Sequence, residues 1–222
     1  MSGKRASDTA YDKIKGWILN GEIAPGSLID ERRMAERLGI SRTPVREALL
    51  RLQTENLVDI ARGKGIRVLA LSSEDMREIY QVITGLEVLA VYLLTGRRPT
   101  RRGLEPLFQT VAAMEAASMS EDGEAWGDAD EAFHRGIVEL CGNRRLAQAA
   151  IKLRDSSRRA HLIAVRLQPA AYRMKSQTYH RDLLQLILAG DPARALASHL
   201  EQRRRGEEAL VSIVEKFNLR NL

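Results

Sequence analysis

Several kinds of residue and segment are scarce in this sequence. It has one cysteine, Cys141, and aromatic residues make up 5% of the chain. A single cysteine cannot form an internal disulfide, which excludes a disulfide framework and fits a reducing compartment. No segment approaches the roughly 18 uninterrupted apolar residues that a membrane span needs, and the basic start is not followed by the apolar stretch of a secretion signal. We therefore expect a cytoplasmic protein without a membrane partner.

The residues that are present are those of a helix-rich globular protein. Charged residues make up 29% of the 222 residues, and Ala, Leu, Arg and Glu are prominent. The net charge is +6 with an isoelectric point near 9.7, which suits a polyanionic partner. Residues 1–70 carry 13 Lys and Arg against 9 Asp and Glu, so most of the positive excess lies there. The length and a change of character near residue 70 predict two domains, over 1–70 and 71–222.

The first domain has the pattern of a winged helix-turn-helix. The spacing of apolar residues predicts three helices, over 9–20, 31–38 and 44–55. Pro44 is tolerated in the first turn of the third helix, and Thr43 is expected to cap it. Strand-like residues over 57–69 surround a glycine-containing turn at 62–65, which predicts a β-hairpin. A hairpin directly after the third helix would be the wing.

The second domain shows helical periodicity and no strand pattern. Turn residues interrupt the periodicity at five places, 97–99, 119–123, 142–143, 168–169 and 190–192. Six helices result, the first beginning near Ser73 with two acidic residues in its first turn. The sequence as a whole predicts a mainly α protein, in which an N-terminal winged helix-turn-helix of three helices and a β-hairpin precedes an all-α, six-helix antiparallel bundle.

A cluster of hydroxyl and guanidinium side chains lies at the start of the third helix. Residues 41–47 read SRTPVRE, and the unpaired N–H groups of a helix N-terminus attract phosphate. Arg42 and Arg46 lie four residues apart on one face, from which an arginine can reach a guanine edge in the major groove. Solvated arginines on an amphipathic helix are the other interpretation, and this stretch alone does not decide between them.

The wider pattern closely resembles the GntR family of bacterial regulators over residues 9–69. The resemblance rests on G-E-I-x-P-G-S-L-I-D-E-R-x-M-A-E-R-L-G-I-S-R-T-P-V-R-E-A-L-x-R-L, then L-V and a glycine-rich wing turn. It implies binding to double-stranded DNA, with contacts from six residues, Arg32, Ser41, Arg42, Thr43, Arg46 and Gly63. Asn56 replaces the glycine that is usual in the family, and asparagine tolerates the same left-handed turn.

Polar residues recur on apolar helix faces in the second domain. Asp130 and His134 lie four apart, and His134 shares its face with apolar residues. His180 and His199 also lie beside leucines on later helices. Burying such groups is costly unless they are paired or bind a metal. Simple i,i+4 hydrogen bonding is favoured from the residues alone, with metal binding left open.

This domain looks like the FadR-type C-terminal sensory domain. The resemblance rests on D-x-x-x-H within DADEAFHR, on the histidine of YHRDLL, and on the final helix after AGDPARALASHL. It implies one divalent metal ion (zinc, nickel or manganese) bound by Asp130, His134, His180 and His199. His161 matches no ligand position and is interpreted as an ordinary helical histidine. Six helices suit the VanR-like branch of the group.

Three classes of function are compatible with these features. The resemblance implies a ligand-responsive regulator, a repressor of a metabolic operon, that binds an inverted-repeat operator as a homodimer and senses a small organic acid. Members often pair that acid with an arginine at a position where this chain has Ile83. A metal-dependent hydrolase is the second class, although no general base is indicated. A constitutive architectural DNA-binding protein is the third.

Overall fold

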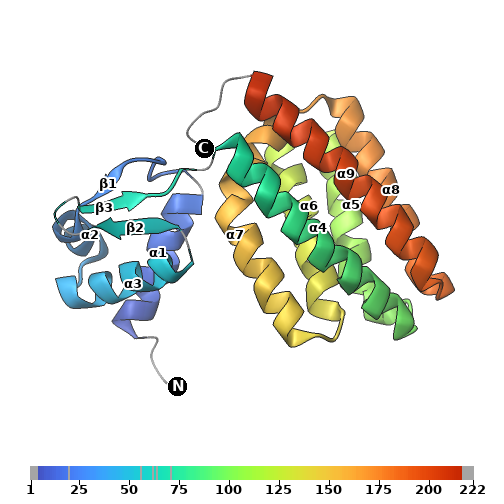
Figure 1. The fold of residues 1–222 in the computed structure, drawn as a ribbon, viewed down its shortest axis with the longest axis horizontal. Helices are drawn as coiled ribbons and strands as arrows, with labels where there is room; N and C mark the ends of the chain where they lie inside the picture. Colours follow the sequence, from blue (N-terminus) through green and yellow to red (C-terminus); the bar gives the residue numbers. More distant parts are fainter. Residues whose placement is uncertain are drawn as a thin grey trace. The chain divides into compact units, whose positions relative to one another are not determined.

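A computed structural model describes residues 5–19, 21–55, 57–61, 63, 65–70 and 72–216 of the chain. These residues divide into two compact units, the first ending at Ser72 and the second beginning at Ser73 (Figure 1). Each unit has its own hydrophobic core and is described by itself.

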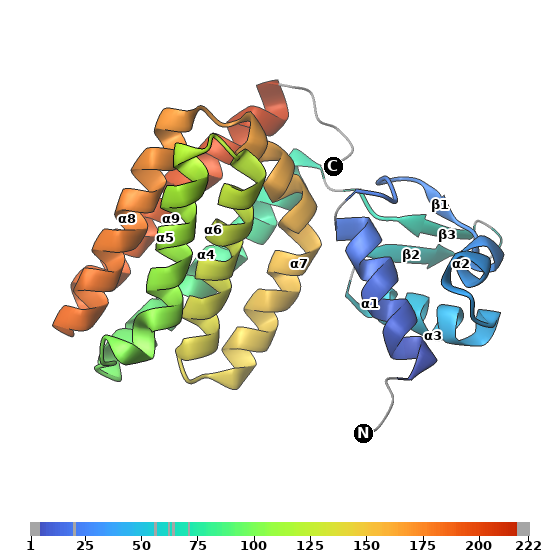
Figure 2. The ribbon, with the colours of Figure 1, turned by 180° about the vertical axis from the view of Figure 1, so that it is seen from behind.

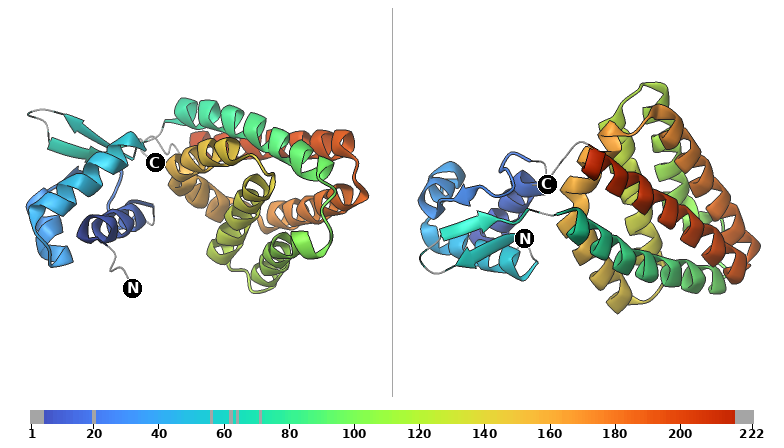
Figure 3. Two further views of the ribbon diagram at one scale, coloured as in Figure 1. Left: turned by 90° about the horizontal axis from the view of Figure 1, so that it is seen from below. Right: turned by 45° about the horizontal axis from the view of Figure 1, so that its top comes forward.

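The first unit contains three helices and a small antiparallel sheet. Its elements are α1 (Ala6–Leu19), β1 (Leu28–Ile29), α2 (Glu31–Leu38), α3 (Arg42–Thr54), β2 (Val58–Ala61) and β3 (Gly65–Val68). The strand order is β1-β3-β2, and Ile66 of β3 pairs with Ile29 on one side and Ile60 on the other. The predicted winged helix-turn-helix is confirmed, and Figure 3 shows it from two further directions.

Strand β1 is the one element of this unit that the sequence analysis missed. Two residues are too few to show an alternating pattern. The strand forms because the turn before it bonds to β3. The Gly26 N–H donates to the Val68 carbonyl, and the Val68 N–H donates to the Ser27 carbonyl. Pairing with a distant strand therefore fixes β1, and local sequence carries no sign of it.

The start of α3 also differs from the prediction. The helix begins at Arg42, and Ser41 holds the N-cap position with extended backbone and no side-chain hydrogen bond to the helix. Thr43 therefore lies within the first turn and does not cap it. Pro44 stays in that turn, where its missing N–H removes no helical hydrogen bond. Asn56 lies outside the described residues.

The second unit is a bundle of α-helices. Its described helices are α4 (Ser73–Gly96), α5 (Glu105–Met119), α6 (Gly123–Leu140), α7 (Arg144–Leu167), α8 (Ala170–Ala189) and α9 (Pro192–Lys216), with the short 3-10 helix η1 (Arg102–Leu104) before α5. The six-helix prediction is confirmed. Helices α4 and α9 pack along each other at the front of this unit in Figure 1, and α5 and α6 come to the front when it is seen from behind in Figure 2.

The ends of these helices follow recognisable signals. Asp122 and Asn143 cap α6 and α7 by accepting hydrogen bonds from N–H groups of the first turn. Gly190 ends α8 in the left-handed region at φ +69°, which glycine adopts without a steric penalty. Local residues therefore determine where α6 and α7 begin and where α8 ends.

Helix α4 contains a long apolar stretch. Among the described helices it alone is long and apolar enough to cross a membrane by length and composition, with 44% of its most apolar window buried in the protein. Met76, Ile83 and Ala90 are almost fully buried, and so is Glu87. The core helix of a bundle meets the same criterion, and the buried carboxylate marks the inner face of α4.

Replacing Asp30 with alanine should destabilise α2. The Asp30 carboxylate accepts hydrogen bonds from the N–H groups of Arg32 (2.7 Å) and Arg33 (3.3 Å), and losing such a cap costs about 1 kcal/mol. Ser41→Ala is the matched control, because Ser41 caps α3 without a side-chain bond. Hydrogen exchange of the α2 and α3 amides measures both changes. Equal acceleration in the two variants would contradict this assignment.

Candidate functional sites

Residues expected to contact DNA meet at one groove of the first unit. The groove has a volume of about 570 Å³ and lies between the start of α2, the exposed face of α3 and the wing strands. Four of the six predicted contact residues line it, Arg32, Arg42, Arg46 and Gly63. Ser41 and Thr43 are exposed at the adjoining N-terminal end of α3. The fold thus brings residues from three separate segments to one surface.

The arginines of this groove are held loosely. The Arg42 Nη2 atom lies 3.9 Å from Glu31 Oε2, and the Arg42 side chain is 70% exposed. The Arg32 Nε atom donates to Glu36 Oε1 at 3.0 Å, again between largely exposed groups. Exposed ion pairs contribute little to stability, so a phosphate can replace these carboxylates at small cost. The N-terminus of α3 adds partial positive charge at the same place.

The four residues predicted as metal ligands come together inside the second unit. Asp130 and His134 lie on α6, His180 on α8 and His199 on α9, and all four are buried. The Asp130 Oδ1 atom lies 3.1 Å from His180 Nε2 and 3.8 Å from His134 Nε2. The two Nε2 atoms are 3.4 Å apart. Three donor atoms from two helices therefore face a common point.

The other ring nitrogen of both histidines contacts an acceptor. His134 Nδ1 lies 2.7 Å from Glu87 Oε2, and His180 Nδ1 lies 2.6 Å from the Ser176 carbonyl oxygen. A neutral imidazole carries one N–H, and the Glu87 carboxylate places that of His134 at Nδ1, so the Nε2 lone pair of His134 faces the Asp130 carboxylate. His180 Nδ1 lies close to the Gln202 amide nitrogen as well, at 3.0 Å, and its Nε2 atom is within hydrogen-bond distance of Asp130, so both tautomers of His180 have partners. Histidines that bind metals are commonly oriented by hydrogen bonds of this kind.

His199 joins the cluster through a different partner. Its Nε2 atom lies 3.1 Å from Glu87 Oε2, and its Nδ1 atom has no hydrogen-bond partner. Glu87, His134 and His199 form a second group of close donor atoms, which shares His134 with the group around Asp130. The fold gathers all four predicted residues, but His199 lies with Glu87 and not with Asp130.

Glu87 is a site residue that sequence reasoning missed. It is fully buried on α4 and is the one charged residue between positions 79 and 96. A carboxylate in so apolar a run requires partners, and that was the available signal. Arg154 of α7 donates to Glu87 Oε1 and, at 2.6 Å, to Glu131 Oε2. Glu87 therefore ties α4 to α6, α7 and α9.

The electrostatics of the cluster keep Glu87 and Asp130 ionised and His134 and His199 neutral. Burial raises the pKa of Glu87, but the charges of Arg203 and Arg154 and the hydrogen bond from His134 outweigh burial and hold that pKa well below its ordinary value. The pKa of Asp130 is also well below its ordinary value, because His134 and the imidazoles that bond to it outweigh burial. Burial lowers the pKa of His134 to about 4 and also lowers that of His199. At neutral pH these two carboxylates and two imidazoles therefore have lone pairs that a cation can use.

These donors fit a divalent metal ion. A carboxylate and imidazole nitrogens are the ligands that zinc, nickel and manganese accept. Asp130, His134 and His180 would hold the ion, because their facing atoms are acceptors. His199, whose Nδ1 atom is buried without a partner, lies next to them.

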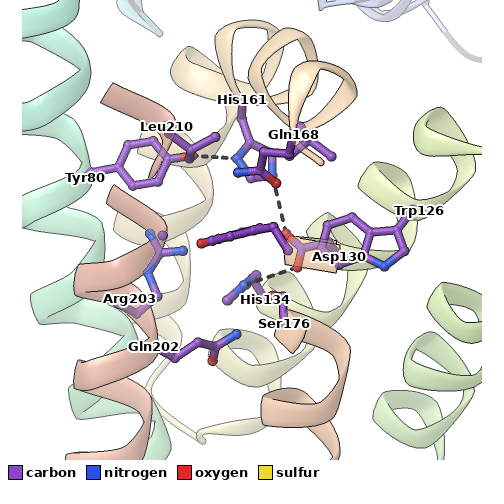
Figure 4. A pocket seen from close by; sticks show the side chains of 13 residues that line it. Tyr80, Trp126, Asp130, His134, His161, Gln168, Ser176, Gln202, Arg203 and Leu210 are labelled. Atoms are coloured by element: carbon purple, nitrogen blue, oxygen red, sulfur yellow. Dashed lines mark hydrogen bonds and ion pairs between the residues drawn. The ribbon is translucent and has the colours of Figure 1, made fainter. Parts of the chain in front are cut away.

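A cavity of about 40 Å³ opens beside Asp130 and His134 (Figure 4). Its walls are aromatic and polar and come from α4, α6, α7, α8 and α9. Its other lining residues are Tyr80, Trp126, His161, Val165, Gln168, Tyr172, Ser176, Gln202, Arg203, Gly206 and Leu210. Convergent polar groups among aromatic side chains are typical of small-molecule sites, although such sites are usually larger, roughly 300–1,000 Å³.

His161 belongs to this cavity, which corrects its interpretation as an ordinary helical histidine. Its Nδ1 atom lies 2.5 Å from the Tyr80 hydroxyl oxygen, and its Nε2 atom lies 3.3 Å from Asp130 Oδ2. Helical spacing shows which face of α7 carries His161 but not which helices pack against that face. The contact with Asp130 therefore emerges only from the tertiary structure.

Arg203 brings a positive charge to the same cavity. Its side chain is buried on α9, with the guanidinium carbon 5.1 Å from the centre of the Tyr80 ring and Nε 3.6 Å from Glu87 Oε2. The Nε and Nη2 atoms of Arg203 have no hydrogen-bond partner. Ile83 is a core residue of α4, 1% exposed. The arginine at this cavity, Arg203, therefore comes from α9, the last helix of the domain, whereas Ile83 is on α4, the first.

Comparison with known proteins agrees with this architecture. The model of the bacterial regulatory proteins of the gntR family matches residues 6–68, and the FCD domain model matches residues 78–202. The solved structure of E. coli McbR/YncC superimposes with a TM-score of 0.81 at 22% identity, over 97% of this chain and all of that one. The fold is that of transcription regulators in which a winged helix-turn-helix is joined to a helical domain.

Similarity of sequence extends this to the family. An uncharacterised HTH-type transcriptional regulator in the TAR-I ttuE-ttuC′ intergenic region of Agrobacterium vitis is 40% identical over 131 residues, which are 58% of this chain and 77% of that protein. The HTH-type transcriptional repressor GlaR of Escherichia coli is 28% identical over 83% of this chain and 86% of its own length. The chain belongs to the GntR family of DNA-binding transcription regulators and carries an FCD domain. Its relatives are regulators and not enzymes, which sets the hydrolase alternative aside.

Acidification should destabilise the second unit. The pKa of His134 is about 4 in the folded protein and 6.5 for the free side chain. The unfolded chain therefore takes up a proton as the pH falls through that window while the folded one does not. Glu87 and Asp130, with lowered pKa values, act in the same direction at still lower pH. Stability present at neutral pH is thus lost on acidification, and thermal unfolding should occur several degrees lower at about pH 5 than at about pH 7.

The variant His134→Gln is the control for this pH dependence. It removes the buried imidazole, so its unfolding temperature should fall less steeply over the same interval. An unfolding temperature of the unchanged protein that stays constant between these two pH values would contradict the assigned neutral state of His134.

Proposed function

We propose that this chain is a ligand-responsive repressor of a metabolic operon that works in the cytoplasm. Residues 1–70 read the operator, and residues 71–222 bind one divalent metal ion, zinc, nickel or manganese, and a small organic acid. Two copies bind an inverted repeat as a homodimer, because each recognition helix serves one half-site. Binding of the acid at the cavity changes the affinity for DNA. The observation that carries the sensory part is the convergence of carboxylate and imidazole donor atoms at the wall of a cavity.

DNA reading is assigned to the groove between α2, α3 and the wing. Arg42 and Arg46 face the major groove from α3, with Ser41 and Thr43 bonding phosphates at its N-terminus. Arg32 contacts the backbone from α2, and Gly63 lets the wing approach closely. The exposure of the arginines and their weak pairing support this assignment.

Metal binding is supported by a conflict among the groups around Asp130. With its proton at Nδ1, His134 directs the Nε2 lone pair at Asp130 Oδ1, 3.8 Å away, and at His180 Nε2, 3.4 Å away. The Gln202 amide nitrogen lies 3.0 Å from His180 Nδ1 and 3.3 Å from His180 Nε2. A lone pair that faces a carboxylate is repelled unless a cation lies between them. A divalent ion bound by Asp130, His134 and His180 removes this repulsion, and His199, whose ring centre lies 5.7 Å from that of His134, would turn away from Glu87 to become the fourth ligand.

A carboxylate effector is supported by Arg203. Its buried guanidinium lines the cavity with two nitrogen atoms that lack a hydrogen-bond partner, although Nε lies 3.6 Å from Glu87, and a planar guanidinium suits a carboxylate. It replaces, from α9, the arginine that is missing at Ile83. The small cavity and the hydroxyls of Tyr80 and Tyr172 favour an acid of few carbon atoms. A cavity lined by an arginine and by tyrosine hydroxyls favours a sensor. A purely architectural protein would need no buried polar groups around a cavity.

The metal and the effector can be tested in one experiment. Purified protein should contain about one metal ion per chain, and carboxylates such as acetate, lactate and succinate should raise its unfolding temperature more than their amides do. His180→Ala should remove both the metal and this response. Arg203→Gln should keep the metal but weaken carboxylate binding by roughly tenfold or more, the loss expected for one charge-assisted contact.

Leu184→Ala is the matched control on α8. Leu184 is fully buried beside the site without a polar atom to offer, so this variant should lose stability and keep its metal. His161 is unsuitable as a control because it contacts Asp130. Wild type that is purified metal-free and does not bind added zinc, nickel or manganese would overturn the metal site. A carboxylate response equal in Arg203→Gln and wild type would overturn the role of Arg203 alone.

Replacing Arg42 or Arg46 with alanine should abolish specific operator binding. Base and phosphate contacts are lost, while both side chains are exposed and leave the core untouched. Gel-shift titration on an inverted-repeat operator measures binding, and sedimentation checks that the oligomer is intact. Lys13→Ala, an exposed cation on α1 outside the groove, is the control. Operator binding at wild-type affinity by Arg42→Ala or Arg46→Ala would contradict the assignment of α3.

A further inference from the structure

The outward face of α4 is unusually apolar. Three of its large side chains are about half exposed, Val82 (53%), Leu89 (46%) and Tyr92 (47%). The charged residue nearest to them in sequence, Glu87, points into the core and is fully buried. The surface between the two ends of this helix is therefore without charge over some five turns. In Figure 3 (left) α4 lies at the edge of the helical unit.

These residues form a regular stripe opposite the buried face. Its members follow one another at alternating steps of four and three residues, Glu78, Val82, Gly85, Leu89, Tyr92 and Gly96. Residues at alternating steps of four and three form the face along which two helices pack in a coiled coil. A Cβ atom added at Gly85 or Gly96 would meet nothing within 4 Å, so both glycines are open notches in the stripe. A helix that packed here could come close at the glycines and insert side chains.

The charges at the two ends of the stripe are of opposite sign. Glu74, Asp75 and Glu78 are exposed at the N-terminal end, where Arg77 pairs with Glu74 and leaves a net negative charge. Beyond the C-terminal end lie four exposed arginines, at positions 97, 98, 101 and 102, of which Arg101 lies 3.7 Å from Glu105, so that this end is net positive. Two such helices packed in parallel would bring like charges together at both ends. Packed antiparallel, each acidic end meets a basic end.

We propose that two copies of this chain associate through the outward faces of their α4 helices, antiparallel and about a two-fold axis. This rests on the proposed homodimer and specifies its surface. In the antiparallel register set by the charged ends, Val82 of one copy faces Tyr92 of the other, and Leu89 of one copy fills the notch at Gly85 of the other. Exchanging the two copies leaves these contacts unchanged, as a two-fold interface requires.

Three single substitutions test the surface. Leu89→Lys places a charge in the centre of the stripe and should convert a dimer into a species with the mass of one chain, 24.9 kDa, in sedimentation equilibrium. Gly85→Met fills the notch and should weaken the dimer by at least tenfold, while its better helix propensity leaves the protomer no less stable. Met119→Lys is the control, since Met119 is 88% exposed on α5 outside the stripe. It should remain dimeric.

Cysteine pairing tests the orientation. A mixture of Gly85→Cys and Leu89→Cys proteins, oxidised under mild conditions, should give mainly the mixed disulfide, because these positions face each other in the antiparallel dimer. A parallel dimer would instead give homodimeric disulfides of each variant. Cys141 is buried and does not compete.

The outcomes separate two kinds of failure. Wild type that sediments as a single chain at every concentration would overturn both this proposal and the homodimer of the proposed function. A Leu89→Lys protein as dimeric as Met119→Lys would overturn only the α4 surface and leave the dimer to another face. Homodimeric disulfides would overturn the antiparallel arrangement.

Discussion

The helical unit depends on one buried charge, the carboxylate of Glu87. A carboxylate taken out of water costs several kcal/mol unless charged and hydrogen-bonded groups surround it. Here those groups come from three other helices, His134 from α6, Arg154 from α7, and His199 with Arg203 from α9. The requirement to satisfy Glu87 therefore specifies how four helices pack. It also fixes the proton of His134 at Nδ1 and so exposes the nitrogen that faces Asp130. Packing and the candidate metal site are two consequences of one constraint.

Most of the fold was predictable because it depends on local signals. Gly190, which ends α8, and Asp122, which caps α6, are recognisable from residue type alone. The apolar periodicity of α4 predicts a core helix. The errors lie where a distant segment decides. Strand β1 exists because β3 bonds to it. Helix α3 begins at Arg42, and its N-cap is Ser41, whose backbone is extended. The Ser41 side chain makes no capping hydrogen bond, so Ser41 and Thr43 were equally plausible caps from the sequence.

The candidate site was predictable only in part, and for a related reason. Spacing and resemblance selected Asp130, His134, His180 and His199, and the fold gathers them from three helices. Spacing could not show that His161 reaches Asp130 from α7, or that Arg203 supplies a charge at the cavity. Each of these contacts joins residues more than 30 positions apart, so helical periodicity carries no information about it. Glu87 differs from these two residues, because a single carboxylate in an apolar stretch can be recognised in the sequence. The sequence does not show which residues are its partners.

Most of the site's buried polar atoms that lack a hydrogen-bond partner are on one helix. Among the described residues they occur at His199, Gln202 and Arg203, close together on α9, and at His161 on α7. Each such atom costs about 1–3 kcal/mol, so the packing of α9 against the cavity is the least satisfied part of the bundle. A ligand shifts a protein toward the arrangement in which it gains more free energy. A metal ion and a carboxylate would supply partners to this turn and so stabilise α9 in its present position. Helix α9 packs along α4, whose outward face we assign to the dimer. The groups that a ligand would satisfy therefore lie one helix away from the surface that we assign to the dimer.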